Sequence, residues 1–306
     1  MYRFVIISFL VVILGANEPI LSLPLTEQPI SDKVKLGKKL FFDTRLSKDN
    51  TISCATCHPI HMGGMDNLEK SFGVNGVEGD VNSPTVLNSG FNFVQFWDGR
   101  VRTLEEQVEG PLHNPKEMAT NWPETTEKLR KDQQYKELFQ KVYNDEITID
   151  HIKNAIAEYE RSLIAPGRFD RFLNGDTKAI SKIEQEGYEL FKSYGCSSCH
   201  QGINVGGNMY EKLGVFTPYF YDRNITKADK GRFNVTNDIV HLHEFKVPSL
   251  RNVAKTYPYF HDGSVKTLQE AIKIMAKHQV GQSISDEDIE KIVKFLNTLT
   301  WEKLEK

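Results

Sequence analysis

Two Cys-x-x-Cys-His motifs account for all four cysteines of the chain, and they constrain the fold more than any other feature of the sequence. Their residues are Cys54, Cys57 and His58 in the first motif, and Cys196, Cys199 and His200 in the second. The pattern is typical of c-type haem attachment, in which two thiols bind the porphyrin and the histidine binds the iron. The alternatives are a structural zinc site and a pair of redox dithiols, but a zinc site gives no reason for a histidine after each cysteine pair. The sequence therefore predicts two covalently bound haems.

The spacing of the motifs predicts two domains. They lie about one domain length apart, so each haem can have its own wrapping of protein. The chain has 306 residues, which is enough for two domains after removal of a leader. Ala165-Pro166-Gly167 interrupts a predicted helix, and the domain boundary is expected there. We therefore expect an N-terminal domain over 23–165 and a C-terminal domain over 166–306. The net charge of −3 argues against nucleic acid as a partner.

The N-terminus has the pattern of an export signal. Arg3 carries the one positive charge, and an apolar run follows it and ends at Gly15 and Ala16. A short apolar run that ends in small residues is typical of a secretory signal peptide, which we assign to residues 1–22. An uncleaved N-terminal anchor is the alternative, whereas the lack of a cysteine near the end of the run excludes a lipoprotein anchor. We expect the mature chain in the periplasm, because c-type haems and oxidisable thiols belong outside the cytosol.

Helical periodicity dominates the remainder, and no series of alternating strands appears. Predicted helices cover 124–143, 150–163, 183–194, 267–275 and 285–299. Thr267 with Glu270 forms a capping box, and Ser285 is placed to cap the terminal helix. Residues 63–90 and 201–248 are rich in Gly, Asn and Pro, and we expect them to wrap the porphyrins as long loops. The predicted fold class is mainly α.

Further motifs resemble the bacterial dihaem cytochrome c peroxidase family, which includes the MauG-type enzymes. They lie, in the family's order, at 63–67, 82–88, 95–100, 104–107, 110–111, 117–118, 202–207, 245–248 and 257–263. The resemblance extends from about residue 36 to residue 299. It implies two cytochrome c-like domains, each of which wraps one covalent haem. It also implies that hydrogen peroxide is reduced to water at the N-terminal haem. The resemblance further implies that the electrons come from a small periplasmic cytochrome c or cupredoxin, that they enter through the C-terminal haem, and that the protein is a homodimer.

The resemblance also assigns catalytic residues. Glu117 matches the family's distal acid/base, and Gln107 lies beside it to orient peroxide and water. Trp97 is expected between the two haems, where it assists electron transfer. From the local sequence alone, a glutamate in a charged loop is usually solvated, and a tryptophan before an Asp-Gly turn is usually a core anchor. The motif context favours the catalytic interpretation.

Ligands of the second iron follow from the same resemblance. Met275 is the expected sixth ligand opposite His200, because a thioether raises the reduction potential of a haem. Met209, in the loop after the second motif, is the alternative. A methionine on the apolar face of a helix is otherwise ordinary core filler. His261 is expected to donate a hydrogen bond to a haem propionate and not to bind iron.

A calcium ion between the domains is a further expectation from the family. The matching positions are the side chain of Asn82 and the backbone carbonyls of Thr256 and Pro258. Oxygen ligands together with waters suit calcium. Without the resemblance, residues 256–258 would be interpreted as an ordinary turn.

One position departs from the family pattern. Many members have a histidine that binds the N-terminal haem iron in the resting state, but the matching residue here is Val74, followed by Asn75. Valine cannot bind iron. The first explanation is that this iron is permanently five-coordinate or water-bound. The second is that His61 or His113 replaces the missing ligand.

Two rival functions remain. A MauG-like oxidase would modify a partner protein, but such enzymes have a tyrosine where Met275 stands. The second rival is a dihaem protein that only transfers electrons, in which Glu117 and Gln107 would have no catalytic role. An assay for peroxide-dependent oxidation of a reduced cytochrome distinguishes a peroxidase from both rival functions.

Overall fold

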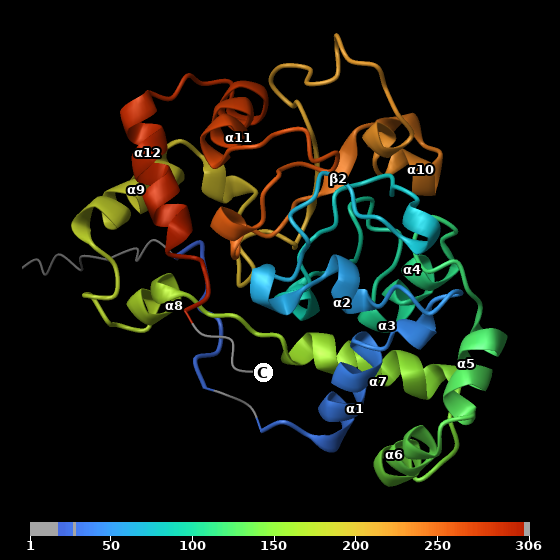
Figure 1. Cartoon of the computed structure of the whole chain (residues 1–306). Coiled ribbons are helices and arrows are strands. Elements are labelled where there is room, and N and C mark those ends of the chain that lie inside the picture. The colour runs from blue at the N-terminus through green and yellow to red at the C-terminus, as the bar shows by residue number, and fades with distance from the viewer. Residues whose placement is uncertain (1–17, 27–28, 303–306) are drawn as a thin grey trace, which may run out of the picture.

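The computed structural model describes residues 18–26 and 29–302, and it confirms the mainly α fold class (Figure 1). The helices are α1 (Asp32–Phe41), α2 (Cys54–Cys57), α3 (Leu104–Gln107), α4 (Glu109–His113), α5 (Trp122–Arg130), α6 (Gln133–Tyr143), α7 (Ile149–Ser162), α8 (Arg168–Leu173), α9 (Lys182–Ser193), α10 (Phe233–Thr236), α11 (Leu268–Met275) and α12 (Asp286–Asn297). Within the described ranges, the strands β1 (Tyr210–Lys212) and β2 (Glu244–Lys246) form a single antiparallel sheet. No helix of the described ranges is long and apolar enough to cross a bilayer.

Each half of the chain is built on a pair of closely crossing helices. In the first half α1 packs on α7, and in the second α9 packs on α12. Gly37 of α1 lies against the backbone carbonyl of Ala155, and Gly187 of α9 lies against that of Lys291. A Cβ atom at either glycine would overlap the facing carbonyl, so the missing side chain allows the close approach. In both domains, therefore, a glycine allows the two helices to pack closely.

Two separate apolar cores accompany these helix pairs. In the first core, the Phe41 and Tyr159 rings meet edge to face at 5.2 Å. In the second, Phe169 meets Tyr188 at 4.8 Å and Phe295 at 5.0 Å. Edge-to-face pairs add about 0.5–1.5 kcal/mol beyond the area that they bury. The first core contains residues up to Ala165, and the second contains Ile20 and residues from Phe169 onwards. The interruption at 165–167 lies between the end of α7 and the start of α8.

The region 124–143 differs from its prediction as one helix. It forms α5 and α6, which are separated at Lys131 and Asp132. The Asp132 side chain accepts hydrogen bonds from the backbone of Gln134 and Tyr135, so it starts a new helix in a new direction. The predicted caps Thr267 and Ser285 are confirmed at α11 and α12. The helix predicted over 150–163 instead begins at Ile149, because Thr148 and not Asp150 caps it.

Residues 18–23 pack on the C-terminal domain, although the sequence assigned 18–22 to the leader and residue 23 to the N-terminal domain. Ile20 and Leu23 are each 1% exposed, and Ile20 belongs to the second core. The Leu21 amide also donates to the carbonyl of Gly202. The remainder of the predicted leader, residues 1–17, lies outside the described residues. Residues 19–23 are thus built into the C-terminal domain.

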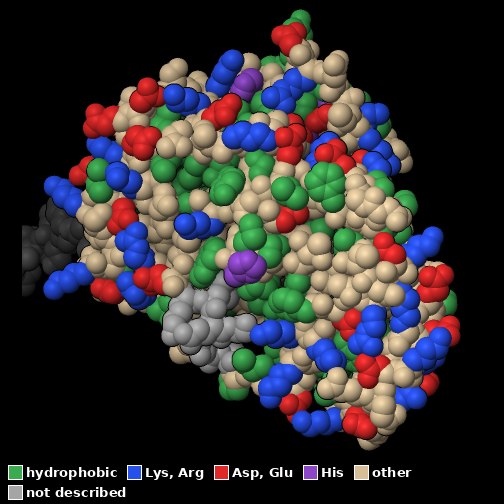
Figure 2. Space-filling model, viewed as in Figure 1, with side chains coloured by type: hydrophobic (Ala, Val, Ile, Leu, Met, Phe, Trp, Pro, Cys, Tyr) green, Lys and Arg blue, Asp and Glu red, His purple; other side chains and the backbone are tan. Residues whose placement is uncertain are grey.

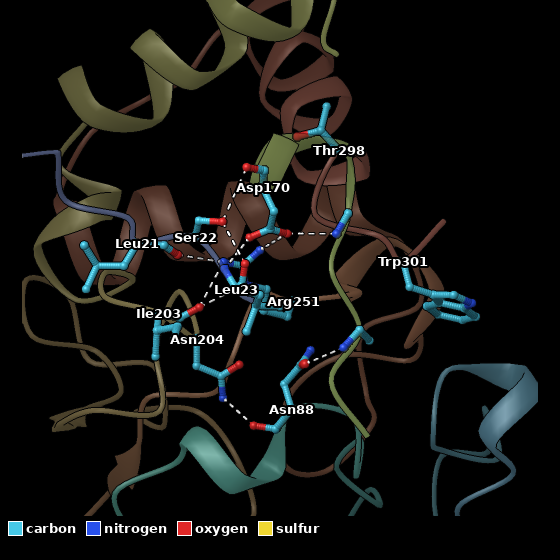
Figure 3. A network of polar contacts seen from close by, with 12 residues as sticks. Leu21, Ser22, Leu23, Asn88, Asp170, Ile203, Asn204, Arg251, Thr298 and Trp301 are labelled. Carbon is cyan, nitrogen blue, oxygen red and sulfur yellow. Dashed lines mark hydrogen bonds and ion pairs between the residues drawn. The ribbon is translucent and has the colours of Figure 1, made fainter. Parts of the chain in front are cut away.

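A buried ion pair anchors this segment (Figure 3). Arg251 and Asp170 have fully buried side chains, and their charged atoms lie 2.7 Å apart. Asp170 also accepts from the Leu23 amide at 2.7 Å, while Arg251 donates to the carbonyls of Leu21 and Ile203 at 2.9 Å. Because each charge has several partners, the cost of burying the pair is offset. One network therefore joins the N-terminal segment, α8 and the loop after the second motif.

Asn88 and Asn204 link the two domains. The Asn88 side chain accepts from the Ala165 amide at 2.8 Å, and the Asn204 side chain donates to the Asn88 carbonyl at 3.3 Å. Asn204 also donates to the side chain of Asn92 at 2.8 Å. Figure 3 shows Asn204 and Asn88 below the ion pair. The contacts fix the loop after the second motif against the first domain.

Candidate functional site

The first motif is placed by a short capped helix. Cys54–Cys57 form α2, and the Ser53 and Thr56 side chains make the capping box at its start. His58 follows at the end of the helix, where its Nδ1 lies 3.1 Å from the carbonyl oxygen of Gly64. Burial lowers the pKa of His58, so the imidazole stays neutral. A neutral ring held through Nδ1 presents Nε2 as a metal ligand, which fits a proximal haem histidine.

The second motif has a similar donor set. Cys196 and Cys199 flank a single turn, and His200 follows them. Burial lowers the pKa of His200 to about 4 despite the nearby carbonyls of Val205 and Pro248. Its buried Nδ1 meets no partner with hydrogen-bond geometry among the described residues. The four cysteines are free thiols, so both motifs keep the groups that a c-type haem requires.

Apolar side chains are exposed in the loops that were expected to wrap the porphyrins. In the loop after the first motif, Leu68 and Phe72 are 42% and 46% exposed. In the loop after the second motif, Phe216 and Tyr221 are 67% and 83% exposed. Figure 2 shows apolar side chains gathered across the centre of this face, with charged side chains around its edge. Large exposed apolar groups mark binding surfaces, and their presence after each motif fits two porphyrins.

Glu117 lies in a tight turn after α4. The Asn114 side chain donates to Oε1 of Glu117 at 2.6 Å, and the Glu117 amide donates to the Asn114 carbonyl at 3.0 Å. Burial raises the pKa of Glu117, and the hydrogen bond from Asn114 and the charge of Arg100 oppose this rise. The sequence analysis missed Asn114, although an Asn-Pro pair at the end of a helix is a turn signal. In this turn, Oε1 of Glu117 accepts a hydrogen bond from Asn114, and burial raises the pKa of the carboxyl group.

The wall beside Glu117 contains a stacked cation. The Arg100 guanidinium lies 3.3 Å from the centre of the Phe96 ring and 3.0 Å from the carboxylate of Asp98. The same ring packs against Gly110 of α4, where a side chain would collide with it. Gln107 is the last residue of α3, immediately before α4, and its side chain is half-buried. Gln107 and Glu117 therefore come from adjoining segments of one α3–α4 unit.

Val74 packs on the same turn. It is 2% exposed, and its amide donates to the Glu117 carbonyl at 2.8 Å. Of the two histidines considered as replacement ligands, His61 is exposed. His113 has its Nδ1 3.4 Å from Glu109 and meets the Trp122 ring edge to face. The position at which the resemblance led us to expect a displaceable histidine thus holds an apolar side chain beside Glu117.

Trp97 connects the domains. Its Nε1 donates to the Asn82 carbonyl at 2.9 Å, and its ring packs with the aromatic cluster that contains Phe245. The ring also meets His261 edge to face at 6.4 Å. Trp97 and Asn82 come from the first domain, whereas Phe245 and His261 come from the second. The structure therefore brings three predicted site residues together where the domains meet.

His261 has a protein partner that the sequence analysis missed. Its Nε2 lies 2.7 Å from Oδ1 of Asp229, and both side chains are buried. Oδ2 of Asp229 accepts from the amide and hydroxyl of Thr226. No local pattern marks Asp229, because it is 32 positions from His261. Donation from His261 to a propionate stays a prediction, and it would have to use the other ring nitrogen.

Both candidate methionine ligands are half-buried. Met275 is the last residue of α11. Met209 precedes β1, and its carbonyl accepts from Val247 at 3.0 Å. The assignment of Met275 as the sixth ligand stays a prediction from the resemblance.

The predicted calcium ligands have oxygen atoms that are free of other hydrogen bonds among the described residues. The Asn82 side-chain amide donates to the Leu68 carbonyl at 2.8 Å, and its backbone amide donates to the His261 carbonyl at 2.8 Å. Within the described ranges, Oδ1 of Asn82 and the carbonyls of Thr256 and Pro258 accept no hydrogen bond. Asn67 holds the neighbouring carbonyls of the 255–257 turn. The predicted ligand oxygens are therefore available to a cation.

Two family models match the chain. Residues 31–178 match di-haem cytochrome c peroxidase, and residues 184–300 match cytochrome c. These matches support haem c as the cofactor.

Curated relatives agree with these models. The chain is 46% identical to the cytochrome c551 peroxidase of Nitrosomonas europaea, over 94% of this chain and 86% of that protein. It is 47% identical to the cytochrome c peroxidase Ccp of Escherichia coli, over 92% of this chain and 61% of that protein. The methylamine utilization protein MauG of Methylophilus methylotrophus is 33% identical, over 88% and 78%.

A solved structure has the same fold. It is a MauG-like protein associated with microbial copper homeostasis, with a TM-score of 0.81, 27% identity, and coverage of 94% of this chain and 95% of that one. The fold, the two haem motifs and the relatives agree, and the chain belongs to the di-haem cytochrome c peroxidase family.

Proposed function

We propose that the protein reduces hydrogen peroxide to water with two electrons from a small cytochrome c or cupredoxin. The observation that carries this proposal is the Glu117–Asn114 pair in the turn after α4. A partly desolvated carboxyl group with a raised pKa is suited to accept a proton and return it. The names of the relatives, which are cytochrome c peroxidases at 41–47% identity, support the same activity.

Glu117 moves the proton between the two peroxide oxygens. When bound, the N-terminal haem supplies the iron at which the O–O bond is cleaved, with His58 as its proximal ligand. Asn114 occupies Oε1 of Glu117, so Oε2 is available to the substrate. It accepts a proton from one oxygen of peroxide and donates it to the other, which leaves as water. Two electrons and two further protons complete the reduction to two waters, and Gln107 orients the peroxide.

When bound, the C-terminal haem would be held by Cys196, Cys199 and His200, with Met275 as a further proposed iron ligand, and it would supply the group that receives electrons from the donor. Trp97 is proposed to assist transfer to the first haem, and its position in the aromatic cluster supports this role. His261 is proposed to donate to a propionate through the nitrogen that Asp229 does not use.

One calcium ion is proposed at Asn82, Thr256 and Pro258. Their available oxygens support it, because calcium takes several oxygen ligands from side chains, carbonyls and water. The site would stabilise the contact between the domains.

The protein is proposed to act in the periplasm as a homodimer, after export by the N-terminal leader. Cleavage is proposed before residue 18 and not after residue 22, because Ile20 and Leu23 are part of the second core. The domains are proposed as 18–23 with 166–302, and 29–165.

Turnover with peroxide tests the proposal. The haem-loaded protein should oxidise reduced cytochrome c when hydrogen peroxide is added, and Glu117→Gln should abolish most of this activity. Glu78→Gln is the matched control, because Glu78 is exposed in a nearby loop. Full activity of Glu117→Gln would contradict the assigned role. If both haems reduce but peroxide causes no turnover, the protein is an electron carrier, and oxidation of a partner protein instead would indicate a MauG-like oxidase.

A further inference from the structure

Lys246 is a buried lysine without a partner. Lys246 is the last residue of β2 and is 6% exposed. Its ammonium group has no ion-pair or hydrogen-bond partner among residues 18–26 and 29–302, and burial is the one influence on its pKa. Lysine is almost never buried unless it is paired, because an unpaired ammonium loses its hydration without compensation. An anionic partner that is not part of the described chain would explain why this ammonium group is buried.

The position of Lys246 is fixed by backbone contacts. It pairs with Tyr210 across the sheet, and its amide donates to the Trp97 carbonyl at 2.8 Å. The following residue, Val247, donates to the Met209 carbonyl. Lys246 is thus held by backbone contacts where the two domains meet.

The carboxylates nearby are already engaged. Phe245 precedes Lys246 and packs 4.6 Å from the His261 ring, and successive residues of a strand face opposite sides. Lys246 therefore faces away from the Asp229–His261 pair. Glu244 lies 3.5 Å from Arg232 and 3.9 Å from His241. The partner must come from outside these groups.

The sheet lies against the second haem motif. The thiol of Cys199 is close enough to Glu211 of β1 for that carboxylate to contribute, after burial, to its raised pKa. Pro248, two residues after Lys246, faces His200 with its carbonyl. Lys246 therefore lies at the end of a strand whose continuation contacts the proximal histidine of the second haem motif, and the paired strand β1 contains the carboxylate nearest to Cys199.

We propose that the Lys246 ammonium is the counter-ion of a propionate of the C-terminal haem. This inference rests on the proposed haem at Cys196 and Cys199. Haem propionates are carboxylates, and a charge-assisted hydrogen bond would satisfy a buried ammonium. Without that anion, burial lowers the pKa of Lys246 to about 8. A positive charge at the haem edge also favours the reduced state, which suits a haem that receives electrons.

Redox titration of the haem-loaded protein tests this assignment. Lys246→Met and Lys246→Gln should lower the reduction potential of the C-terminal haem. The expected change is about tenfold in its redox equilibrium, which is about 59 mV for one electron. Lys212→Gln is the matched control, because Lys212 lies on the same sheet but is exposed to solvent, and it should leave both potentials unchanged.

Unchanged potentials in both Lys246 variants with full haem content would overturn the proposal, as would a change confined to the N-terminal haem. If the variants fail to take up haem, the wild-type protein gives the answer. A haem-loaded crystal structure should place Nζ of Lys246 within hydrogen-bond distance of a propionate oxygen, and any other partner would contradict the inference. These readouts do not depend on peroxide turnover, so failure of the proposed function would be seen separately.

Discussion

The side-chain amide of Asn114 donates a hydrogen bond of 2.6 Å to Oε1 of Glu117, three residues along the same turn. This contact leaves Oε2 of Glu117 as the oxygen that can exchange a proton with a substrate. It also lowers the pKa of Glu117 against the larger effect of burial, which raises it. The amide therefore controls both the geometry and the protonation of the proposed acid/base.

Removal of this amide should move the pH profile of activity. In Asn114→Ala, the pKa of Glu117 loses a lowering influence and rises further. Because the carboxylate must be ionised to accept a proton, the acid limb of kcat/KM against pH should shift to higher pH. Glu117→Gln should instead lower kcat by about 10²–10⁴-fold at all pH values. An unchanged acid limb in Asn114→Ala would show that Glu117 is not the base.

The N-terminal haem iron should be high-spin in the fully oxidised protein, because Val74 offers no ligand. Electron paramagnetic resonance of the oxidised protein would detect this state without prior reduction. His61→Ala and His113→Ala test the alternative, since loss of a low-spin signal in one of them identifies a replacement ligand. A low-spin bis-histidine signal that persists in the wild type and in both variants would contradict both explanations.

Met275→Ala should lower the reduction potential of the C-terminal haem and change its low-spin spectrum, because the thioether ligand is lost. Met209→Ala should change neither. Redox titration and absorption spectra of the two variants check the assignment. The reverse result would make Met209 the ligand.

Breaking the Asp170–Arg251 pair should destabilise the second domain. Arg251→Met leaves the buried Asp170 carboxylate without its charge partner, at a cost of about 3–5 kcal/mol. Lys266→Met is the control, because it removes an exposed pair with Glu69 that contributes about 0–1 kcal/mol. Denaturant unfolding measures both. Equal midpoints for the two variants would show that the network carries little of the stability.

Glu160 should make stability depend on pH. Burial raises its pKa from 4.5 to about 8, and its Oε2 has no hydrogen-bond partner among the described residues. The folded state therefore binds a proton that the unfolded state releases, and stability falls as pH rises from about 5 to about 8. Glu160→Gln should remove this fall and gain on the order of a few kcal/mol at pH 8, with no gain near pH 5.

Thermal unfolding across this pH range measures the effect of Glu160. Glu158→Gln is the control on the same helix, because Glu158 is half-exposed and paired with Arg161. A parallel pH dependence in wild type and Glu160→Gln would mean that Glu160 is ionised in the folded protein.

Local patterns were predictable because their physical cause lies within a few residues. Thr267 and Ser285 cap α11 and α12 through the backbone three residues ahead. The stripe over 124–143 was correct in its apolar positions but not in its continuity. Periodicity alone does not register that Asp132 can end one helix and begin another.

Contacts between distant segments were not predictable in this way. Asp229 and His261 are 32 positions apart, and Leu23 and Asp170 are 147 apart. Residues 18–22 have no polar signal that separates them from a leader, yet Ile20 is buried in the second core. Their role is visible only when the C-terminal domain closes around them.

The sequence by itself determined the chemistry of this protein, because two cysteine–histidine pentapeptides specify covalent haem attachment through bonds made within five residues. Its helical periodicity also determined the fold class. Only the tertiary structure decided which side chains are buried and what they face. It paired His261 with Asp229, left Lys246 without a charge partner and held Oε1 of Glu117. Burial and long-range pairing arise from packing between segments that the linear order keeps apart, and burial raises the pKa of Glu117 and lowers that of Lys246.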